Sequence, residues 1–220
     1  MNLANYQHAS GCTEYYLAKN EIANSDPKTA YMNFLRRLDA NLAQIQAKSA
    51  VKMCCGKGCW YCCDIKVDVK APEALVIAEY IRERVNPAQQ KVILEKAKHN
   101  AAIFQNMEEE ERLAAHLQCP LLIDNCCMAY EVRPANCRIY HSIDFITCKK
   151  TYEEPENLYI PRTVIEDYYD SGNEQYDDFC IAAEEAGYDD DDYELSIALV
   201  AALMNRASLK RYKKKKRAFV

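Results

Sequence analysis

Cysteines are the residues of this chain whose type and spacing could do chemistry. The 220-residue chain has 12 cysteines, and most of them fall in two short blocks, Cys54 to Cys63 and Cys119 to Cys148. A chain of this length can bury a core without covalent staples, and a reducing cytosol prevents stable disulfides, so clustered cysteines there more often bind metal or react. The blocks therefore predict a thiolate metal site. A disulfide or redox relay and inert buried thiols are the alternatives.

The first block has a backbone suited to chelation. It reads Cys-Cys-Gly-Lys-Gly-Cys-Trp-Tyr-Cys-Cys, and its glycines can take positive φ, which lets a loop curl around an ion. Cys55, Cys59 and either Cys62 or Cys63 would give three ligands, and a distant cysteine such as Cys137 would give the fourth.

The type of metal follows from the ligands. Thiolates suit zinc, Cu(I) and iron–sulfur clusters, and a closed zinc site needs four ligands in a tetrahedron. The three-plus-one pattern favours an iron–sulfur cluster of the [4Fe-4S] type over zinc. His141 is an alternative fourth ligand, since imidazole suits both zinc and iron.

The elements that must position these loops are mainly helices. Apolar residues recur at helical spacing over about 27–50, from Pro72 to Val85, after Asn86-Pro87, and from Tyr193 to about Lys210. Pro161 starts a shorter helix to about 170, another covers about 177–186, and an extended piece covers 65–69. The predicted fold class is mainly α, with short β pieces and helices that support a loop-rich cysteine cluster. The predicted parts are an N-terminal arm (1–26), a helical metal-binding domain (27–160), a helical extension packed on it (161–209) and a basic tail (210–220).

Two segments resemble a known family. The first is Cys55-Gly-Lys-Gly-Cys59-Trp-Tyr-Cys62-Cys63, and the second combines Cys119-Pro-Leu with Tyr130-x-x-Arg133-Pro-x-x-Cys137-Arg138. Together they are similar to the YkgJ-type cysteine-cluster family, described as a zinc- or iron-chelating CxxCxxCC domain, over about residues 50–150. The resemblance implies eight family cysteines: Cys55, Cys59, Cys62, Cys63, Cys119, Cys127, Cys137 and Cys148. Cys54 and Cys126 are extra neighbours.

Polar and aromatic residues near the second block are expected to complete the site. Arg133 and Arg138 flank Cys137, and their guanidinium groups would partly neutralise an anionic thiolate cluster and bond to sulfur or backbone. Tyr130 would donate to the same shell. Trp60, between cysteines, would shield the site from water.

The function indicated is metal binding, and catalysis is left open. Hydrolase, phosphate-loop and dinucleotide-binding motifs are missing from the sequence. The alternative is an iron–sulfur-dependent modification or redox enzyme. Flagellin lysine N-methylases carry a similar cysteine cluster, but no separate methyl-donor domain is found in this chain.

The charge and hydropathy of the sequence limit the kinds of partner and the location to be expected. No apolar run is long enough to span a membrane, and the first residues lack a secretory pattern, so a cytoplasmic protein without membrane association is expected. Residues 166–194 carry acidic residues and no Lys or Arg, whereas residues 206–217 carry basic residues and no Asp or Glu. Either the tail is frayed and solvated, or it folds back on the acidic segment or meets a protein partner. Nucleic-acid binding is not favoured, because the basic run is short and has no aromatic platform.

Overall fold

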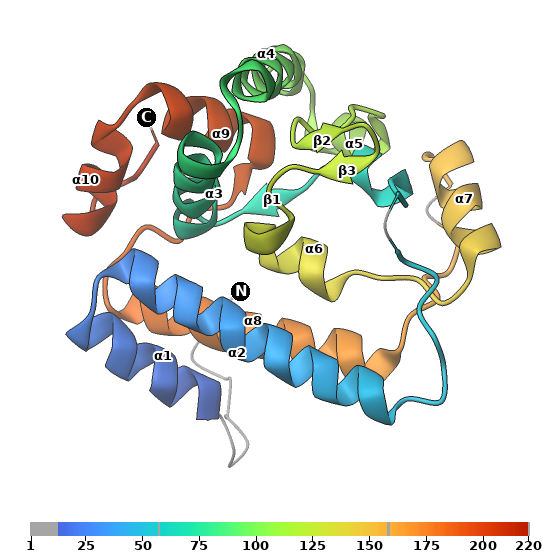
Figure 1. Cartoon of the computed structure of the whole chain (residues 1–220), viewed down its shortest axis with the longest axis horizontal. Coiled ribbons are helices and arrows are strands. Elements are labelled where there is room, and N and C mark those ends of the chain that lie inside the picture. The colour runs from blue at the N-terminus through green and yellow to red at the C-terminus, as the bar shows by residue number, and fades with distance from the viewer. Residues whose placement is uncertain (1–12, 57, 158, 220) are drawn as a thin grey trace.

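Helices form most of the molecule, as the sequence predicts. The computed structural model describes residues 13–56, 58–157 and 159–219. A layer of three long helices lies below a second group, and the cysteine loops lie to one side (Figure 1). The helices are α1 (Thr13–Asn24), α2 (Pro27–Lys48), α3 (Ala71–Arg84), α4 (Pro87–Phe104), α5 (Glu109–Ala114), α6 (Ala135–Ile139), α7 (Phe145–Glu153), α8 (Glu166–Glu185), α9 (Leu195–Met204) and α10 (Ala207–Lys213).

Local signals explain where the long helices begin. The Asp26 side chain accepts a hydrogen bond from the N–H of Lys28 at 3.0 Å, and Pro27 occupies the first turn of α2. Asn86 caps α4 in the same way, with the N–H of Gln89 at 2.9 Å. Each side chain satisfies a backbone donor that has no partner inside its helix.

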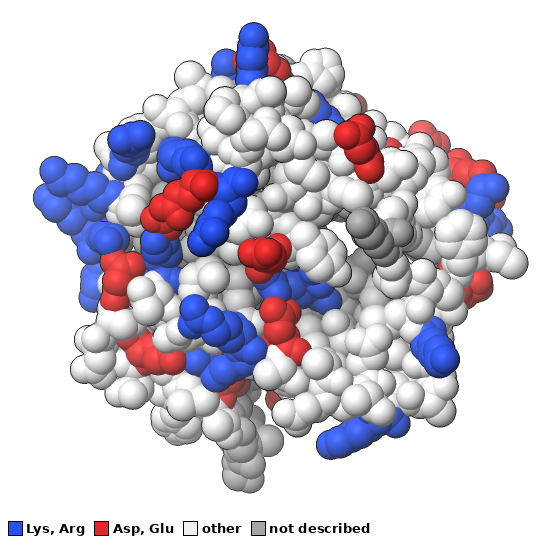
Figure 2. Space-filling view, viewed as in Figure 1, with Lys and Arg blue, Asp and Glu red and all other residues white. Residues whose placement is uncertain are grey.

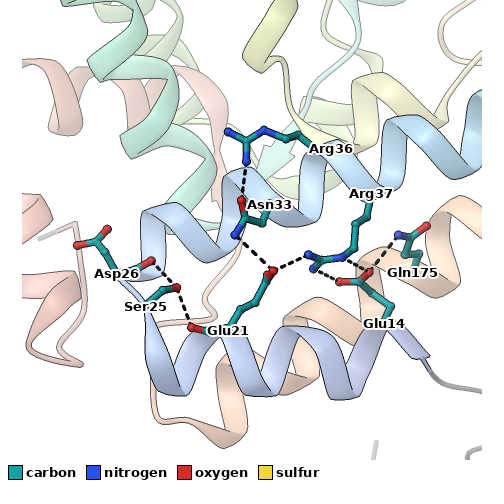
Figure 3. Close-up of polar contacts among 8 residues, drawn as sticks. All are labelled: Glu14, Glu21, Ser25, Asp26, Asn33, Arg36, Arg37 and Gln175. Atoms are coloured by element: carbon teal, nitrogen blue, oxygen red, sulfur yellow. Dashed lines mark hydrogen bonds and ion pairs between the residues drawn. The ribbon is translucent and has the colours of Figure 1, made fainter.

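The lower layer contains α1, which lies inside the segment 1–26 that the sequence predicts as an N-terminal arm without regular structure. Residues 13–24 are helical, so that prediction is wrong for them, and residues 1–12 lie outside the described part. Arg37 of α2 donates from Nε and Nη2 to the carboxylate of Glu14 at 2.8 and 2.6 Å, and from Nη1 to Glu21 at 2.8 Å (Figure 3). Gln175 of α8 also donates to Glu14, at 3.1 Å. These polar contacts and the buried Ala18 fix α1 on its neighbours.

Aromatic rings fill the core between α2 and α8. Phe34 stacks on Phe179 with ring centroids 4.7 Å apart, and Tyr31 meets the same ring at 5.6 Å. All three side chains are buried. Two short helices are predicted here, from Pro161 to about 170 and over about 177–186. The structure instead has one continuous helix, α8, which runs through Gly172. The burial of its apolar stripe offsets the low helix propensity of glycine.

Gly172 allows α8 to approach α2 and α6 closely. A Cβ atom there would lie 2.9 Å from Cγ1 of Ile139 and 3.2 Å from Cδ2 of Leu42. We expect Gly172→Leu to lower the free energy of unfolding by about 2 kcal/mol, because a well-packed core accepts extra volume only by strain. Chemical denaturation measures this, with Glu174→Leu on the exposed face as the control. Equal stability of both variants would contradict the close packing.

Two small antiparallel sheets pin the loops to the helices. β1 (Asp68–Val69) pairs with β4 (Tyr193–Glu194), so the chain before α3 is held beside the start of α9. β2 (Leu122–Ile123) pairs with β3 (Cys126–Cys127) through a tight turn. Asp124 and Asn125 in that turn have positive φ, which these residue types tolerate better than most.

The basic tail is packed, and the interpretation of a frayed tail is wrong. Phe219 is buried and its ring lies 4.9 Å from that of Tyr193. Arg217 pairs with Asp191 of the acidic segment at 3.0 Å. Lys and Arg gather on the side of the molecule where α10 lies, with Asp and Glu among them (Figure 2). A protein partner for this surface remains a prediction.

None of the helices in residues 13–56, 58–157 and 159–219 is both long enough and apolar enough to cross a membrane.

Candidate metal centre

Backbone hydrogen bonds bring the two cysteine blocks together. The N–H of Cys119 donates to the carbonyl of Cys63 at 2.6 Å. At the start of the first block, the N–H of Cys54 donates to the carbonyl of Ser142 at 2.8 Å, and the N–H of Ser142 donates to Sγ of Cys55 at 3.3 Å. The predicted convergence of the blocks is therefore confirmed at two points.

The eight cysteines that the resemblance implies come from six different places around this junction. Cys55 and Cys59 lie in the loop after α2, and Cys62 and Cys63 lie in the 3₁₀ helix Tyr61–Asp64 (η2). The others follow along the second block. Cys119 precedes β2, Cys127 ends β3, Cys137 lies in α6 and Cys148 lies in α7.

The thiols act on one another electrostatically. Burial, together with the Cys62, Cys59 and Cys55 thiols, raises the pKa of Cys148 to about 11. Burial also raises the pKa of Cys137, with Cys62 and Cys127 adding to the effect. Neighbouring thiolates repel because all of them are negatively charged. Without a cation nearby, each thiol therefore favours its neutral form.

Cys119 belongs with the buried part of the group. Burial raises the pKa of its thiol, and Cys137 and Cys127 add to the shift. The thiol of Cys62 has its pKa raised by a hydrogen bond with the Cys63 thiol and by burial. The charge of Cys62 acts on Cys55, Cys137 and Cys148, which come from both blocks.

The remaining cysteines differ in position. Cys126 and Cys127 are consecutive in β3, so their side chains point to opposite faces. Cys127 pairs with the buried Leu122 and is influenced by both Arg133 and Arg138, which supports the choice of Cys127 over Cys126. Of the remaining three, Cys54 is exposed and its charge acts on Cys55 and Cys148, Cys180 lies in α8, and Cys12 is outside the described residues.

Arg133 is placed to act on the thiols. Its Nε donates to the carbonyl of Cys137 at 3.3 Å, and its guanidinium lies 3.9 Å from the ring centroid of Tyr130. Its charge lowers the pKa of Cys62, Cys127 and Cys137, against the larger effects that raise it. Tyr130 is largely exposed, so in this structure it supports Arg133 more directly than it supports a thiol.

Arg138 has a different role. It is only 4% exposed, and its guanidinium bonds to protein groups. Nη1 donates to the Asp39 carboxylate at 2.6 Å, Nε to the carbonyl of Arg133 at 3.0 Å and Nη2 to the carbonyl of Glu131 at 2.6 Å. Arg138 therefore holds the segment that precedes Cys137 and reaches the thiols through its charge.

His141 is not free to bind metal. Its Nδ1 lies 3.0 Å from the carbonyl of Ile139, and its Nε2 accepts from the N–H of Ile165 at 2.8 Å. Both ring nitrogens are used by the backbone, and the ring is buried. The alternative of His141 as a fourth ligand is therefore disfavoured. Trp60 packs on Tyr61 at 5.1 Å and on Tyr152 of α7 at 5.2 Å, whereas Cys54 and Cys55 in the first loop are exposed, so the predicted shielding does not reach them.

Two buried carboxylates near the cysteines were missed in the sequence. Glu73 accepts the N–H of Ala135, the first residue of α6, at 2.9 Å and so positions the helix that carries Cys137. Asp64 follows Cys63 in η2 and is 8% exposed, and its Oδ1 has no hydrogen-bond partner among the described residues. The only signal for Asp64 was its place beside a cysteine pair.

The fit of these residues to a metal rests on the chemistry of the donors. Within residues 13–56, 58–157 and 159–219, no three His, Cys, Asp or Glu side chains are already arranged to hold one ion. The donors are nevertheless suitable, because free thiols from two adjacent loops repel when ionised and a bound cation would remove that repulsion. Binding would have to draw the thiols closer together.

Comparisons of this chain with family models, curated proteins and solved structures find no match. The resemblance to the YkgJ-type family therefore rests on the motifs alone. The proposals below depend on the geometry of the loops.

Proposed function

We propose that this protein binds an iron–sulfur cluster or zinc through thiolates of its two cysteine loops. The observation that carries the proposal is the junction of the blocks, where the N–H of Cys119 bonds to the carbonyl of Cys63. This bond joins the backbones of the two distant blocks that carry the eight thiols. When bound, such a metal would provide a cationic centre that cross-links the loops.

The residues around the thiols have separate tasks in this proposal. Arg133 offsets negative charge beside Cys62 and Cys137. Arg138 and Glu73 hold α6, and the rings around Trp60 pack the first loop against α7. A reducing location such as the cytoplasm belongs to the proposal, since all described cysteines are free thiols. An iron–sulfur-dependent modification or redox enzyme remains a prediction that no particular contact favours.

Anaerobic purification followed by elemental analysis and a visible spectrum tests the proposal. We expect about one or more iron or zinc ions per chain, and we expect Cys137→Ser to lose a large part of that metal. Cys180→Ser is the matched control, because Cys180 is also a poorly exposed thiol but lies in α8. Chelation should lower the melting temperature, since a ligand at a thousand times its Kd stabilises by about 4 kcal/mol. Metal-free protein with an unchanged melting temperature would refute the proposal.

A further inference from the structure

The Asp64 carboxylate is unusual among the buried polar groups near the cysteines. Its Oδ1 atom is buried and has no hydrogen-bond partner among the described residues. An unpaired buried polar atom destabilises the folded state, and a charged one does so more strongly. Native structures rarely keep such an atom unless an ion or a water molecule completes its contacts.

Two basic side chains in the described part of the chain act on Asp64, and neither bonds to it. His116 has the larger effect, and its ring packs against Tyr152 with centroids 4.8 Å apart. Lys96 donates from Nζ to the side chain of Gln118 and to the carbonyl of Leu122, both at 2.8 Å. No ion pair joins Lys96 to Asp64 in the described part of the chain, in contrast to the ion pair between Lys66 and Asp68 at 2.8 Å.

Cysteines share the surroundings of this oxygen. Asp64 follows Cys63 in η2, and the carbonyl of Cys63 is bonded to the N–H of Cys119. A second observation also links these three residues. The charges of Cys119, Asp64 and Cys63 all act on the amine of Lys96. One carboxylate and two thiols therefore come from two chain segments that are already joined.

We propose that Asp64 is an oxygen ligand of a metal ion held with Cys63 and Cys119, a role that rests on the proposed function. A carboxylate beside thiolates suits zinc or ferrous iron, because both ions accept mixed sulfur and oxygen ligands. Cys127 and Cys137 act electrostatically on Cys119 and are the candidates for the remaining positions.

Binding of Co²⁺ to the full chain under anaerobic conditions tests this role. We expect Asp64→Asn to weaken Co²⁺ affinity about tenfold or more in a competition titration and to shift the visible bands of the bound ion. In the metal-free protein the same variant should melt at an unchanged or higher temperature, because it removes a buried charge without a partner. Asp177→Asn, on α8, is the control and should alter neither measurement.

A second variant separates ligation from packing. Asp64→Cys replaces the oxygen with a thiolate, so it should bind Co²⁺ more tightly than Asp64→Asn and add sulfur-to-cobalt charge-transfer intensity. Unchanged affinity and spectrum in Asp64→Asn would overturn the role of Asp64 while leaving the proposed function intact. A wild-type chain that binds no Co²⁺ and contains no metal as purified would overturn both.

Discussion

Glu73→Gln is expected to lower the free energy of unfolding by about 3 kcal/mol, because this buried carboxylate accepts four hydrogen bonds. The donors are the hydroxyls of Tyr31 at 3.0 Å and Tyr176 at 2.5 Å, and the N–H groups of Lys70 at 2.7 Å and Ala135 at 2.9 Å. A glutamine has one acceptor oxygen, so the donors to the other oxygen would face an amide N–H. Urea denaturation measures the loss.

The pH dependence of this effect has a defined sign. Burial raises the pKa of Glu73 above its ordinary value, against the hydrogen bonds that lower it. The folded protein therefore keeps the Glu73 carboxyl group protonated at a pH at which the same group in the unfolded chain has lost its proton. The Glu73 contribution is complete below the ordinary pKa and falls as the pH rises through the folded value. The difference in stability between wild type and Glu73→Gln should therefore shrink as the pH rises.

Glu79→Gln provides the control for both measurements. Glu79 lies in the same helix but is partly exposed, and it pairs with Lys28 near the surface. Exposed ion pairs contribute at most about 1 kcal/mol. A loss as small in Glu73→Gln as in Glu79→Gln would show that the four bonds contribute little.

Arg138→Met is the second substitution for which we expect a large effect, again about 3 kcal/mol in the free energy of unfolding. It leaves the carbonyls of Glu131 and Arg133 without a buried donor and removes the partner of Asp39. Since these contacts tie the segment before α6 to α2, the variant should also weaken metal binding.

Lysine at the same position tests whether the planar guanidinium is required. Arg138→Lys retains the charge but cannot donate in three directions from one fixed plane, so it should recover less than half of the lost stability. Arg36→Met, on the exposed face of α2, should change stability by no more than about 0.5 kcal/mol. Full recovery by lysine would mean that charge alone holds this segment.

Much of the fold could be predicted from local sequence. The cap at Asp26 and the apolar spacing after it place α2 within a few residues of its observed ends, and the cap at Asn86 places the start of α4 but not its end at Phe104. The helix predicted from Tyr193 is less regular, because β4 takes its first residues and a break at Asn205 separates α9 from α10. Strand pairing with β1 overrides the helical spacing there.

Features that depend on tertiary contacts were beyond local reasoning. α1 looks polar in sequence because Glu14 and Glu21 face Arg37, a contact between separate helices. α6 and α7 were hidden in the cysteine block, since each is short.

The candidate site shows the same division. The spacing of the cysteines indicated which thiols to consider, and the joined loops support that choice. The sequence could not show that Asp64 lacks a hydrogen-bond partner or that both nitrogens of His141 are occupied, because these properties arise only when distant backbone groups meet.

The order of the elements along the chain has a consequence for biosynthesis. α2 needs Phe179 and Tyr176 of α8 to close its aromatic core, and both cysteine loops precede α8. During translation the thiols therefore leave the ribosome before the helix that completes their support. Contacts between residues distant in sequence form late. The cysteine thiols of the nascent chain are therefore exposed to solvent before the hydrophobic core has formed. For the metal binding that we propose, delivery of the metal and protection of the thiols from oxidants would matter most in that interval.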